Sequence, residues 1–240
     1  MAADARKRQK KQERRSRKRK EKKQVLVRRQ SLGLAERLAA ACQSPVLHCW
    51  ITESLWEEGI GFVMLSRELP DGRVAVAGFL VDRYCLGVKD AFGEICRGTE
   101  YVGRFVEEVG RRMRGRDVAP ADARKLLHEA VAYARGIGLA PHPDFAEAIV
   151  LFGDVNPADG TAEFEFGLDG KPCFFAGPND TPGRCRQILA ILNRTCGPGH
   201  FGFVTPRSES GSGADLLTRD EADELALENW DEDDEILDDL

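Results

Sequence analysis

The sequence lacks any long apolar run. The longest extends over the eight residues from Val74 to Val81 and includes a glycine. A membrane-spanning helix needs about 20 consecutive apolar residues, so we expect no membrane span and no membrane partner. The basic N-terminus is not followed by an apolar segment, and we therefore expect no secretory signal peptide. Both absences favour a cytoplasmic protein.

Paired cysteine motifs are also missing. Seven cysteines are present, but no two have C-x-x-C spacing and no histidine lies near them at zinc-finger spacing. Without an export signal, free thiols in a reducing compartment are expected, and free cysteines are usually small buried side chains. No phosphate-binding G-x-x-x-x-G-K-[ST] loop occurs. We therefore expect no metal site and no cofactor.

Charge of both signs is abundant but is divided along the chain. Over all 240 residues the formal net charge is only −5. Residues 1–30 contain 15 Lys and Arg against 3 Asp and Glu, whereas residues 207–240 contain 2 against 14. Residues 31–206 contain 18 against 23. The near-neutral total is therefore a cancellation between a basic N-terminal end and an acidic C-terminal end.

The basic end, residues 1–30, is here called the basic arm. It has no apolar face to bury, so we expect a disordered or solvated segment. Its cations suit the phosphates of nucleic acid, and we expect RNA or a ribosome rather than DNA. It contains no aromatic residue and so cannot stack on bases. The predicted phosphate-contacting residues are Arg6, Lys7, Arg8, Lys10, Lys11, Arg14, Arg15, Arg17, Lys18, Arg19, Lys20, Lys22, Lys23, Arg28 and Arg29.

The acidic end supplies a second hypothesis. Residues 206–213 have the composition of a flexible linker, and residues 215–240 form an acidic tail with a few apolar anchors. Oppositely charged ends attract one another, although salt screens this attraction over about 8 Å. We hypothesise that the tail binds the basic arm within the molecule and competes with nucleic acid. The alternative is that the tail only confers solubility.

The chain is predicted to have three parts. Residues 1–43 are the basic arm continuing into a helix, residues 44–204 are one globular domain, and residues 205–240 are the linker and tail. Pro45 is expected to end the first helix. We expect an α+β domain in which a small sheet of two β-hairpins packs against three or four helices, between disordered charged termini.

Two Asp-Gly pairs predict the hairpins, because glycine tolerates the positive φ of a tight turn. The first pair is Asp71-Gly72 and the second is Asp169-Gly170. The predicted strand pairs are 60–69 with 73–82, and 162–167 with 172–176; a further strand is expected at 46–52 and a short extended piece at 85–88. Apolar residues at helical spacing predict helices at 101–113, 120–137 and 183–195, with a short one ending at Leu151.

Three segments resemble one known family. They are LVDRYCLGVKDAF (80–92), GLAPHPDF (138–145) and EFGLDGKPCFFAGPND (165–180). Over about residues 46–204 the chain resembles an uncharacterised family of bacterial proteins. The resemblance implies a bacterial, cytoplasmic origin and a single α+β domain, and it implies no activity.

One segment is the best candidate for chemistry. An apolar strand delivers Asp82, Cys85, Lys89 and Asp90 to its carboxyl end, where ligands often bind in helix-covered sheets. A thiol beside a cation can be activated as a thiolate, and the charged groups could equally serve as a metal-binding or acid–base set. His142, held between two prolines and followed by Asp144, could act as a general base. The sequence therefore offers an enzyme, a hydrolase or a metal-dependent nuclease, as an alternative function.

The same residues also have a structural interpretation. Asp82 can cap a turn, Cys85 can belong to the core, and Lys89 can pair with a neighbouring carboxylate. His142 can simply lie in a turn between two helices. This interpretation is favoured, because structural ion pairs resemble functional sites in sequence.

A second carboxylate pattern bears on the nuclease alternative. Glu163 and Glu165 alternate with apolar residues, so both should lie on one face, with Lys171 just beyond the turn. Metal-dependent nucleases use two carboxylates and a lysine, but an exposed hairpin shows the same alternation. The leading prediction is therefore a non-enzymatic protein that contacts nucleic acid. A protein-interaction adaptor whose charged ends bind partners is the third class.

Overall fold

The computed structural model describes residues 33–177 and 180–205. The strands are β1 (Val46–Thr52), β2 (Ile60–Glu68), β3 (Arg73–Asp82), β4 (Gly87–Arg97), β5 (Gly115–Asp117), β6 (Cys173–Phe175) and β7 (Gly202–Val204). The α-helices are α2 (Leu34–Ala41), α3 (Ser54–Glu57), α4 (Gly98–Tyr101), α5 (Val109–Arg112), α6 (Pro120–Gly136), α7 (Phe145–Ala148) and α8 (Pro182–Cys196). A π-helix, η1 (Val102–Glu108), joins α4 to α5, and η2 (Ile149–Phe152) and η3 (Pro157–Asp159) are 3₁₀-helices.

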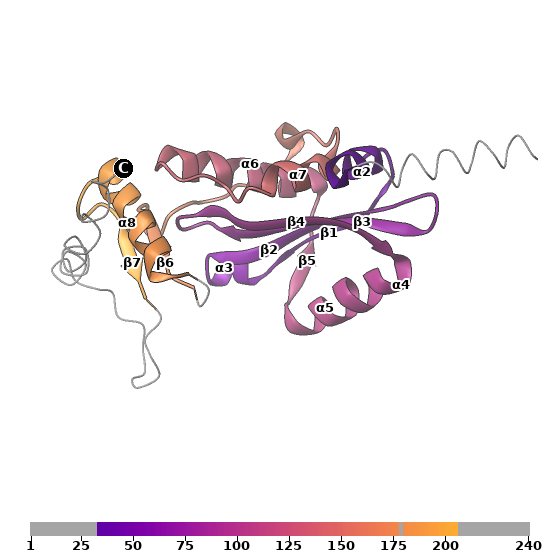
Figure 1. Ribbon diagram of the computed structural model, residues 1–240, viewed down its shortest axis with the longest axis horizontal. Helices are drawn as coiled ribbons and strands as arrows, with labels where there is room; N and C mark the ends of the chain where they lie inside the picture. Colours follow the sequence, from indigo (N-terminus) through magenta and orange to yellow (C-terminus); the bar gives the residue numbers. More distant parts are fainter. Residues whose placement is uncertain (1–32, 178–179, 206–240) are drawn as a thin grey trace, which may run out of the picture.

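The central element is a five-stranded antiparallel sheet with the strand order β4-β3-β2-β1-β5. Helices α2, α6 and α7 cover one face of this sheet, whereas α4 and α5 lie on the other face (Figure 1). A smaller unit of β6, β7 and α8 lies at one end (Figure 1). The fold is therefore α+β, as the sequence predicts.

The hairpin of β2 and β3 forms as predicted. Gly72 adopts φ +80°, and the amide of Leu69 donates to the carbonyl of Arg73 at 2.8 Å. Nine residue pairs then align the two strands without interruption. Almost all of β3 is buried on both faces, because helices lie above and below it. This two-sided cover explains why its sequence is apolar throughout.

The second predicted hairpin is wrong. Residues 162–167 form no strand, and β6 pairs in parallel with β7 instead of returning along them. The tight turn itself exists: Leu168 and Lys171 exchange two backbone hydrogen bonds around Asp169 and Gly170, which both have positive φ. The preceding segment stays outside the sheet because Phe164 and Phe166 pack their side chains into the main core beside α6.

The short piece expected near Val88 is instead the beginning of β4, an eleven-residue strand. It pairs along the whole length of β3. The small side chains of its inward face reflect close helix packing, since a Cβ on Gly93 would lie 2.5 Å from the Leu38 side chain of α2. The chain after β4 forms the excursion α4–η1–α5 and then β5, which adds three residues to the far edge of the sheet.

Three buried clusters hold the domain together. The largest lies between the sheet and α2, α6 and α7, around side chains such as Phe79, Leu127 and Phe152. A second includes Phe174 and Leu192 in the unit of β6, β7 and α8. The third, around Met64, lies between the sheet and the excursion. Each predicted helix therefore buries one apolar face, which is what stabilises short helices in proteins.

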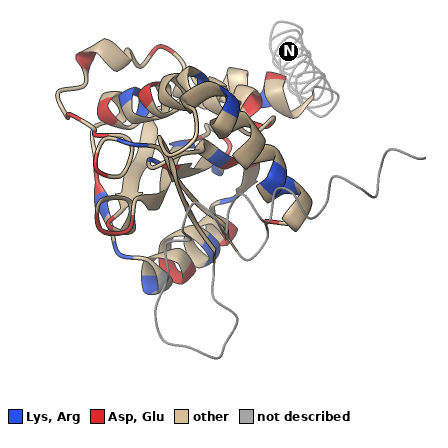
Figure 2. Cartoon of the chain, turned by 90° about the vertical axis from the view of Figure 1, so that its left-hand side faces the viewer, with Lys and Arg blue, Asp and Glu red and all other residues tan. Residues whose placement is uncertain are grey.

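Charges are interspersed over the described elements (Figure 2). Among residues 33–177 and 180–205, no helix is long and apolar enough to span a bilayer. Both predicted interaction segments, the basic arm at 1–30 and the acidic tail at 215–240, lie outside the described residues. The described part begins just before α2, whose Leu38 is fully buried in the main core.

Candidate functional site

Asp82 lies at the end of β3, where its side chain caps the turn into β4. Its carboxylate accepts hydrogen bonds from the backbone amides of Tyr84 at 2.9 Å and Cys85 at 3.1 Å. The residue is only 4% exposed. Burial raises the pKa of Asp82 to about 6, although the backbone hydrogen bonds and the charge of Lys89 oppose the shift. This contact pattern matches the structural interpretation of Asp82.

Cys85 follows in the same turn and is completely buried. Burial raises the pKa of its thiol above the ordinary value of 9.0, and the nearby carboxylate of Asp82 raises it further. A reactive cysteine needs the opposite surroundings, partly exposed and electropositive. The expectation of a thiolate activated by a cation is therefore not met, and Cys85 packs in the cluster of Phe174 and Leu192.

Lys89 occupies a β-bulge in β4. Leu80 of β3 pairs with Asp90 and Val81 pairs with Val88, so Lys89 is the extra residue. A bulge redirects its side chain, and the ammonium group of Lys89 lies 2.7 Å from the carboxylate of Asp180. Burial alone would raise the pKa of Asp180, but the hydrogen bond from Lys89, the amide of Gly177 and the charge of Arg184 lower it below its ordinary value.

Asp90 and His142 meet at the exposed edge of β4. Nε2 of His142 lies 3.6 Å from Oδ1 of Asp90. Nδ1 of His142 accepts from the amide of Asp144 at 3.3 Å, so the neutral ring carries its proton on Nε2, toward Asp90. The backbone amide of His142 donates to the carbonyl of Val88 at 2.9 Å. This backbone hydrogen bond fastens the PHPD turn to the sheet edge.

The five predicted residues are thus distributed among three places. Asp82 and Cys85 lie inside the turn, Lys89 binds Asp180, and Asp90 contacts His142. None of the five lines either of the two hollows described below. The structure gives each residue its own contacts rather than one shared site. A catalytic role for any of them stays a prediction.

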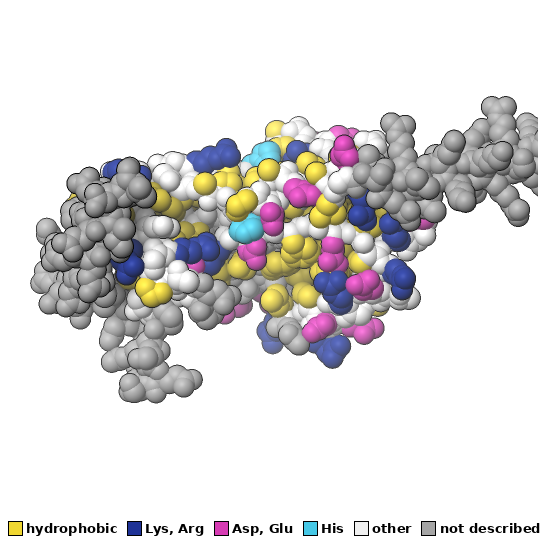
Figure 3. All heavy atoms as spheres, in the orientation of Figure 1, with side chains coloured by type: hydrophobic (Ala, Val, Ile, Leu, Met, Phe, Trp, Pro, Cys, Tyr) yellow, Lys and Arg dark blue, Asp and Glu magenta, His cyan; other side chains and the backbone are white. Residues whose placement is uncertain are grey.

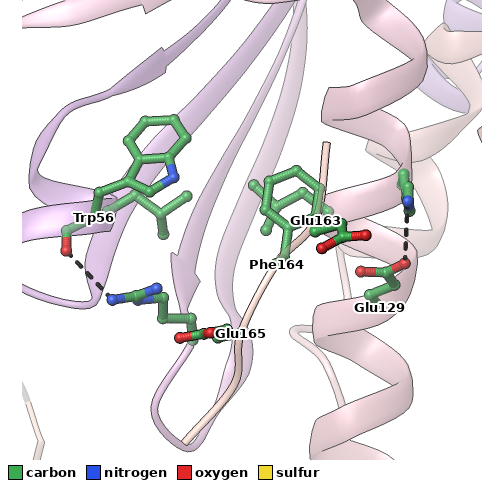
Figure 4. A pocket seen from close by; sticks show the side chains of 9 residues that line it. Trp56, Glu129, Glu163, Phe164 and Glu165 are labelled. Carbon is green, nitrogen blue, oxygen red and sulfur yellow. Dashed lines mark hydrogen bonds and ion pairs between the residues drawn. The ribbon is translucent and has the colours of Figure 1, made fainter. Parts of the chain in front are cut away.

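The first hollow, here called the carboxylate pocket, has a volume of about 520 Å³. Figure 4 shows it between α3, α6 and the segment that carries Glu163 and Glu165. Its lining combines three carboxylates, two cations and apolar side chains: Glu129, Glu163, Glu165, Arg83, Lys125, Leu55, Trp56, Leu126 and Phe164.

The cations of the carboxylate pocket already have protein partners. Lys125 donates to the carbonyl of Ala162 at 2.8 Å and lies 4.0 Å from Glu129. Arg83 donates to the carbonyl of Trp56 at 3.3 Å. Within the described residues, no three His, Cys, Asp or Glu side chains are placed to hold a metal ion together.

The nuclease alternative therefore gains little from this pocket. Glu163 and Glu165 are both exposed, whereas Ala162, Phe164 and Phe166 between and beside them are half-buried. The predicted alternation is thus present without a strand. Lys171 is not among the residues that line the pocket. Glu129 of α6, which was not singled out from the sequence, lines the pocket together with Glu163 and Glu165.

The second hollow, here called the aromatic groove, has a volume of about 460 Å³. It lies on the sheet face opposite α6, between β1, β5 and the excursion. Its lining is His48, Trp50, Glu53, Tyr101, Phe105, Val106, Gly110, Met113, Arg114, Gly115 and Asp117. This site was not predicted from the sequence.

A continuous series of aromatic rings runs through and beside the aromatic groove. From His48 the ring centroids are 5.8 Å to Tyr101, 5.7 Å on to Phe105 and 6.1 Å on to Phe92. The series then continues to Phe62 at 5.9 Å and to Trp50 at 6.3 Å. In the view of Figure 3, apolar side chains lie among charged ones over the described part of the chain. His48 is the exposed member of this series, Trp50, Phe62 and Phe92 are half-buried, and Tyr101 and Phe105 are buried.

The segment from α4 to the end of β5, residues 98–117, is slightly more basic than the domain as a whole. It contains five arginines against four Asp and Glu, whereas residues 31–206 contain 18 Lys and Arg against 23 Asp and Glu. Arg104 is paired with Glu94 and Glu100. Arg111 and Arg114 are exposed, and within the described residues no carboxylate pairs with either.

The signal for the groove was present in the sequence but incomplete. His48 and Trp50 alternate along a predicted strand, which places both on one face. The chain returns from strand β4 to β5, at the other edge of the sheet, and this return brings Tyr101 and Phe105 against that face. Spacing in the sequence does not reveal such a topology.

Comparisons of the chain with protein-family models, with curated proteins and with solved structures found no match to any of them.

Proposed function

We propose that this protein binds nucleic acid, RNA in preference to DNA, through the basic arm. The observation that carries the proposal is the charge of that arm, 15 Lys and Arg against 3 Asp and Glu in residues 1–30. Phosphate contacts by such residues release counterions, which makes affinity fall steeply with salt. In the sequence the arm precedes α2, which packs in the main core.

A binding role is favoured over catalysis by the contacts of the predicted catalytic residues. Asp82 caps a turn, Cys85 is a buried thiol with a raised pKa, and Lys89 is engaged by Asp180. Each of these groups has a structural partner that accounts for its position. These contacts account for the three residues without a catalytic role, and the enzyme alternative stays a prediction.

The test compares two variants that each lose three cations. One carries Arg14→Gln, Arg15→Gln and Arg17→Gln in the basic arm. The matched control carries Arg135→Gln, Arg186→Gln and Arg194→Gln, three exposed arginines of α6 and α8. The logarithm of the binding constant for a 20-nucleotide single-stranded RNA is measured against the logarithm of salt concentration.

For single strands each phosphate contact contributes about −0.7 to this slope. The arm variant is expected to lose about 2 from the magnitude of the slope, while the control keeps the slope of the unmodified protein. Equal slopes for both variants would contradict the proposal. Polyglutamate that binds as tightly as RNA of equal charge would favour the adaptor hypothesis instead.

A further inference from the structure

We propose that the aromatic groove is a second contact site for the same strand and accepts its unpaired bases. This inference rests on the proposed function, because the basic arm supplies the phosphate contacts that bring the strand to the domain. The groove would add stacking, which the arm cannot provide because it contains no aromatic residue.

The floor of the groove is fixed in place by buried contacts. Tyr101 is 1% exposed and Phe105 is 6% exposed. The Tyr101 hydroxyl lies 2.7 Å from Nδ1 of His48 and 2.9 Å from Oγ of Ser66. The imidazole of His48 is exposed and nearly parallel to the Tyr101 ring, with an interplanar angle of 14°. The exposed His48 ring is therefore held in one orientation by the buried Tyr101, which lowers the entropic cost of stacking a base on it.

Trp50 is the second accessible ring of the groove. It is half-buried and projects from β1, where it lies opposite β5. Gly115 of β5 leaves the space that its indole occupies, since a Cβ at Gly115 would lie 2.9 Å from Cε3 of Trp50. The position of the indole thus depends on a residue without a side chain.

The distribution of charge favours a base inside the groove and phosphates at its rim. Arg114 lines the groove and Arg111 lies on α5; both are exposed. Glu53 and Asp117 also line the groove. These carboxylates would repel a phosphate placed between them, but they can accept hydrogen bonds from the amino groups of bases.

The size of the groove agrees with this occupant. A volume of about 460 Å³ lies in the ordinary range of sites for small ligands, roughly 300 to 1,000 Å³. An apolar helix of a partner protein is the competing occupant, since Val106 and Met113 at the groove are 44% and 46% exposed. Such a helix would place its apolar side chains against Glu53, Arg114 and Asp117, which a base with polar edges tolerates better.

The experiment uses Trp50 as the reporter in the full chain. The substitutions Trp56→Phe and Trp230→Phe leave Trp50 as the only tryptophan. Its fluorescence is followed during titration with a 12-nucleotide single-stranded RNA of mixed sequence and with inorganic polyphosphate of the same number of phosphates. We expect RNA to quench Trp50, because a stacked base contacts the indole, and polyphosphate to bind without quenching it.

A second measurement gives the contribution to affinity. Trp50→Leu in the otherwise unmodified chain is expected to weaken RNA binding about tenfold while the salt slope stays unchanged. Gly115→Ala, which displaces the indole, is expected to weaken binding in the same direction. Trp56→Leu is the matched control, because Trp56 lines the carboxylate pocket and not the aromatic groove, and its affinity should equal that of the unmodified protein.

The outcomes separate this inference from the function on which it rests. Suppose that RNA binds with a steep salt slope, but Trp50 is not quenched and all variants keep the affinity of the unmodified protein. That result overturns the inference that the groove binds bases, and it leaves the proposed function standing. Absence of salt-dependent RNA binding by the full chain overturns the proposed function itself. A dimer in sedimentation that Met113→Lys dissociates would show that the groove is an interface between copies, which also overturns the inference.

Discussion

The ammonium group of Lys89 lies 2.7 Å from the carboxylate of Asp180, a residue 91 positions later in the chain. This ion pair joins the bulge of β4 to the segment that leads into α8. The side chains of Lys89 and Asp180 are 14% and 1% exposed. Such a pair fixes the position of the smaller unit at the end of the sheet. Removing either residue destabilises the fold, because the other charge is then buried without its partner.

Lys89→Met is expected to destabilise the domain by about 3 kcal/mol, because it leaves the carboxylate of Asp180 buried without its main partner. Urea unfolding measures this loss. The matched control is Lys171→Met, which removes an exposed lysine and should change the free energy of unfolding by less than about 0.5 kcal/mol. Equal effects of the two substitutions would show that the ion pair does not hold the unit in place.

The pH dependence of stability provides a test of Asp180 itself. Its pKa is lowered in the folded chain, so the folded state binds this proton less readily than the unfolded state does. The resulting stabilisation is present above the ordinary pKa of 3.8 and is lost as pH falls below it through the folded pKa. The variant Asp180→Asn should lack this acid-induced loss; an unchanged acid limb of the stability curve would speak against it.

Asp82 predicts a pH dependence of the opposite sign. Its pKa is raised from 3.8 to about 6 in the folded chain, so stability falls as pH rises between these two values. Asp82→Asn keeps an oxygen that accepts from Tyr84 and Cys85 but removes the buried charge. Relative to the unmodified protein, we expect this variant to gain up to about 3 kcal/mol between pH 4 and pH 7.5. Thermal and urea unfolding at both pH values measure the gain, and a constant difference between the two proteins would contradict the assignment.

Arg67 of β2 holds two segments outside the sheet. Its guanidinium donates to the carbonyls of Leu151 at 2.8 Å and Phe152 at 2.9 Å, and also to that of Ser44. Arg67→Met should cost roughly 2–4 kcal/mol, since these carbonyls lose their charged donor. Arg73→Met is the control, because Arg73 pairs with Asp71 at the surface and should contribute less than about 1 kcal/mol. A smaller effect at Arg67 than at Arg73 would refute this assignment.

The acidic tail offers a prediction about regulation. If residues 215–240 compete with RNA for the basic arm, replacing their Asp and Glu by Asn and Gln should raise RNA affinity several-fold at about 0.02 M salt. The gain should disappear near 1 M salt, where charges are screened within about 3 Å. Fluorescence anisotropy of a labelled RNA measures both affinities. Unchanged affinity at low salt would leave the tail with a role in solubility alone.

Much of the sheet and most helices could be predicted because their signals are local. Asp71-Gly72 specifies the β2–β3 turn, and Pro120 and Pro182 occupy the first turns of α6 and α8. The alternation at Phe164 and Phe166 predicted burial correctly but not pairing, because a side-chain pattern does not show where backbone hydrogen bonds are made.

The length of strand β4 was underestimated for a different reason. The bulge at Lys89 interrupts its alternation, and its inward positions Ala91 and Gly93 are small because α2 and α7 approach closely. The inward face therefore carries a weak apolar signal. The partner of Lys89 and the aromatic groove depend on residues far apart in sequence, so neither could be found from local spacing.

The salt dependence of RNA binding by the full chain, with and without residues 1–30, tests the proposed function most directly. The deletion removes none of the described residues, which begin at residue 33. For a 20-nucleotide RNA we expect the full chain to show a slope of about −3 or steeper, as four or more phosphate contacts require, and the shortened chain to show a much shallower slope. Equal slopes for the two proteins would contradict nucleic-acid binding through the basic arm.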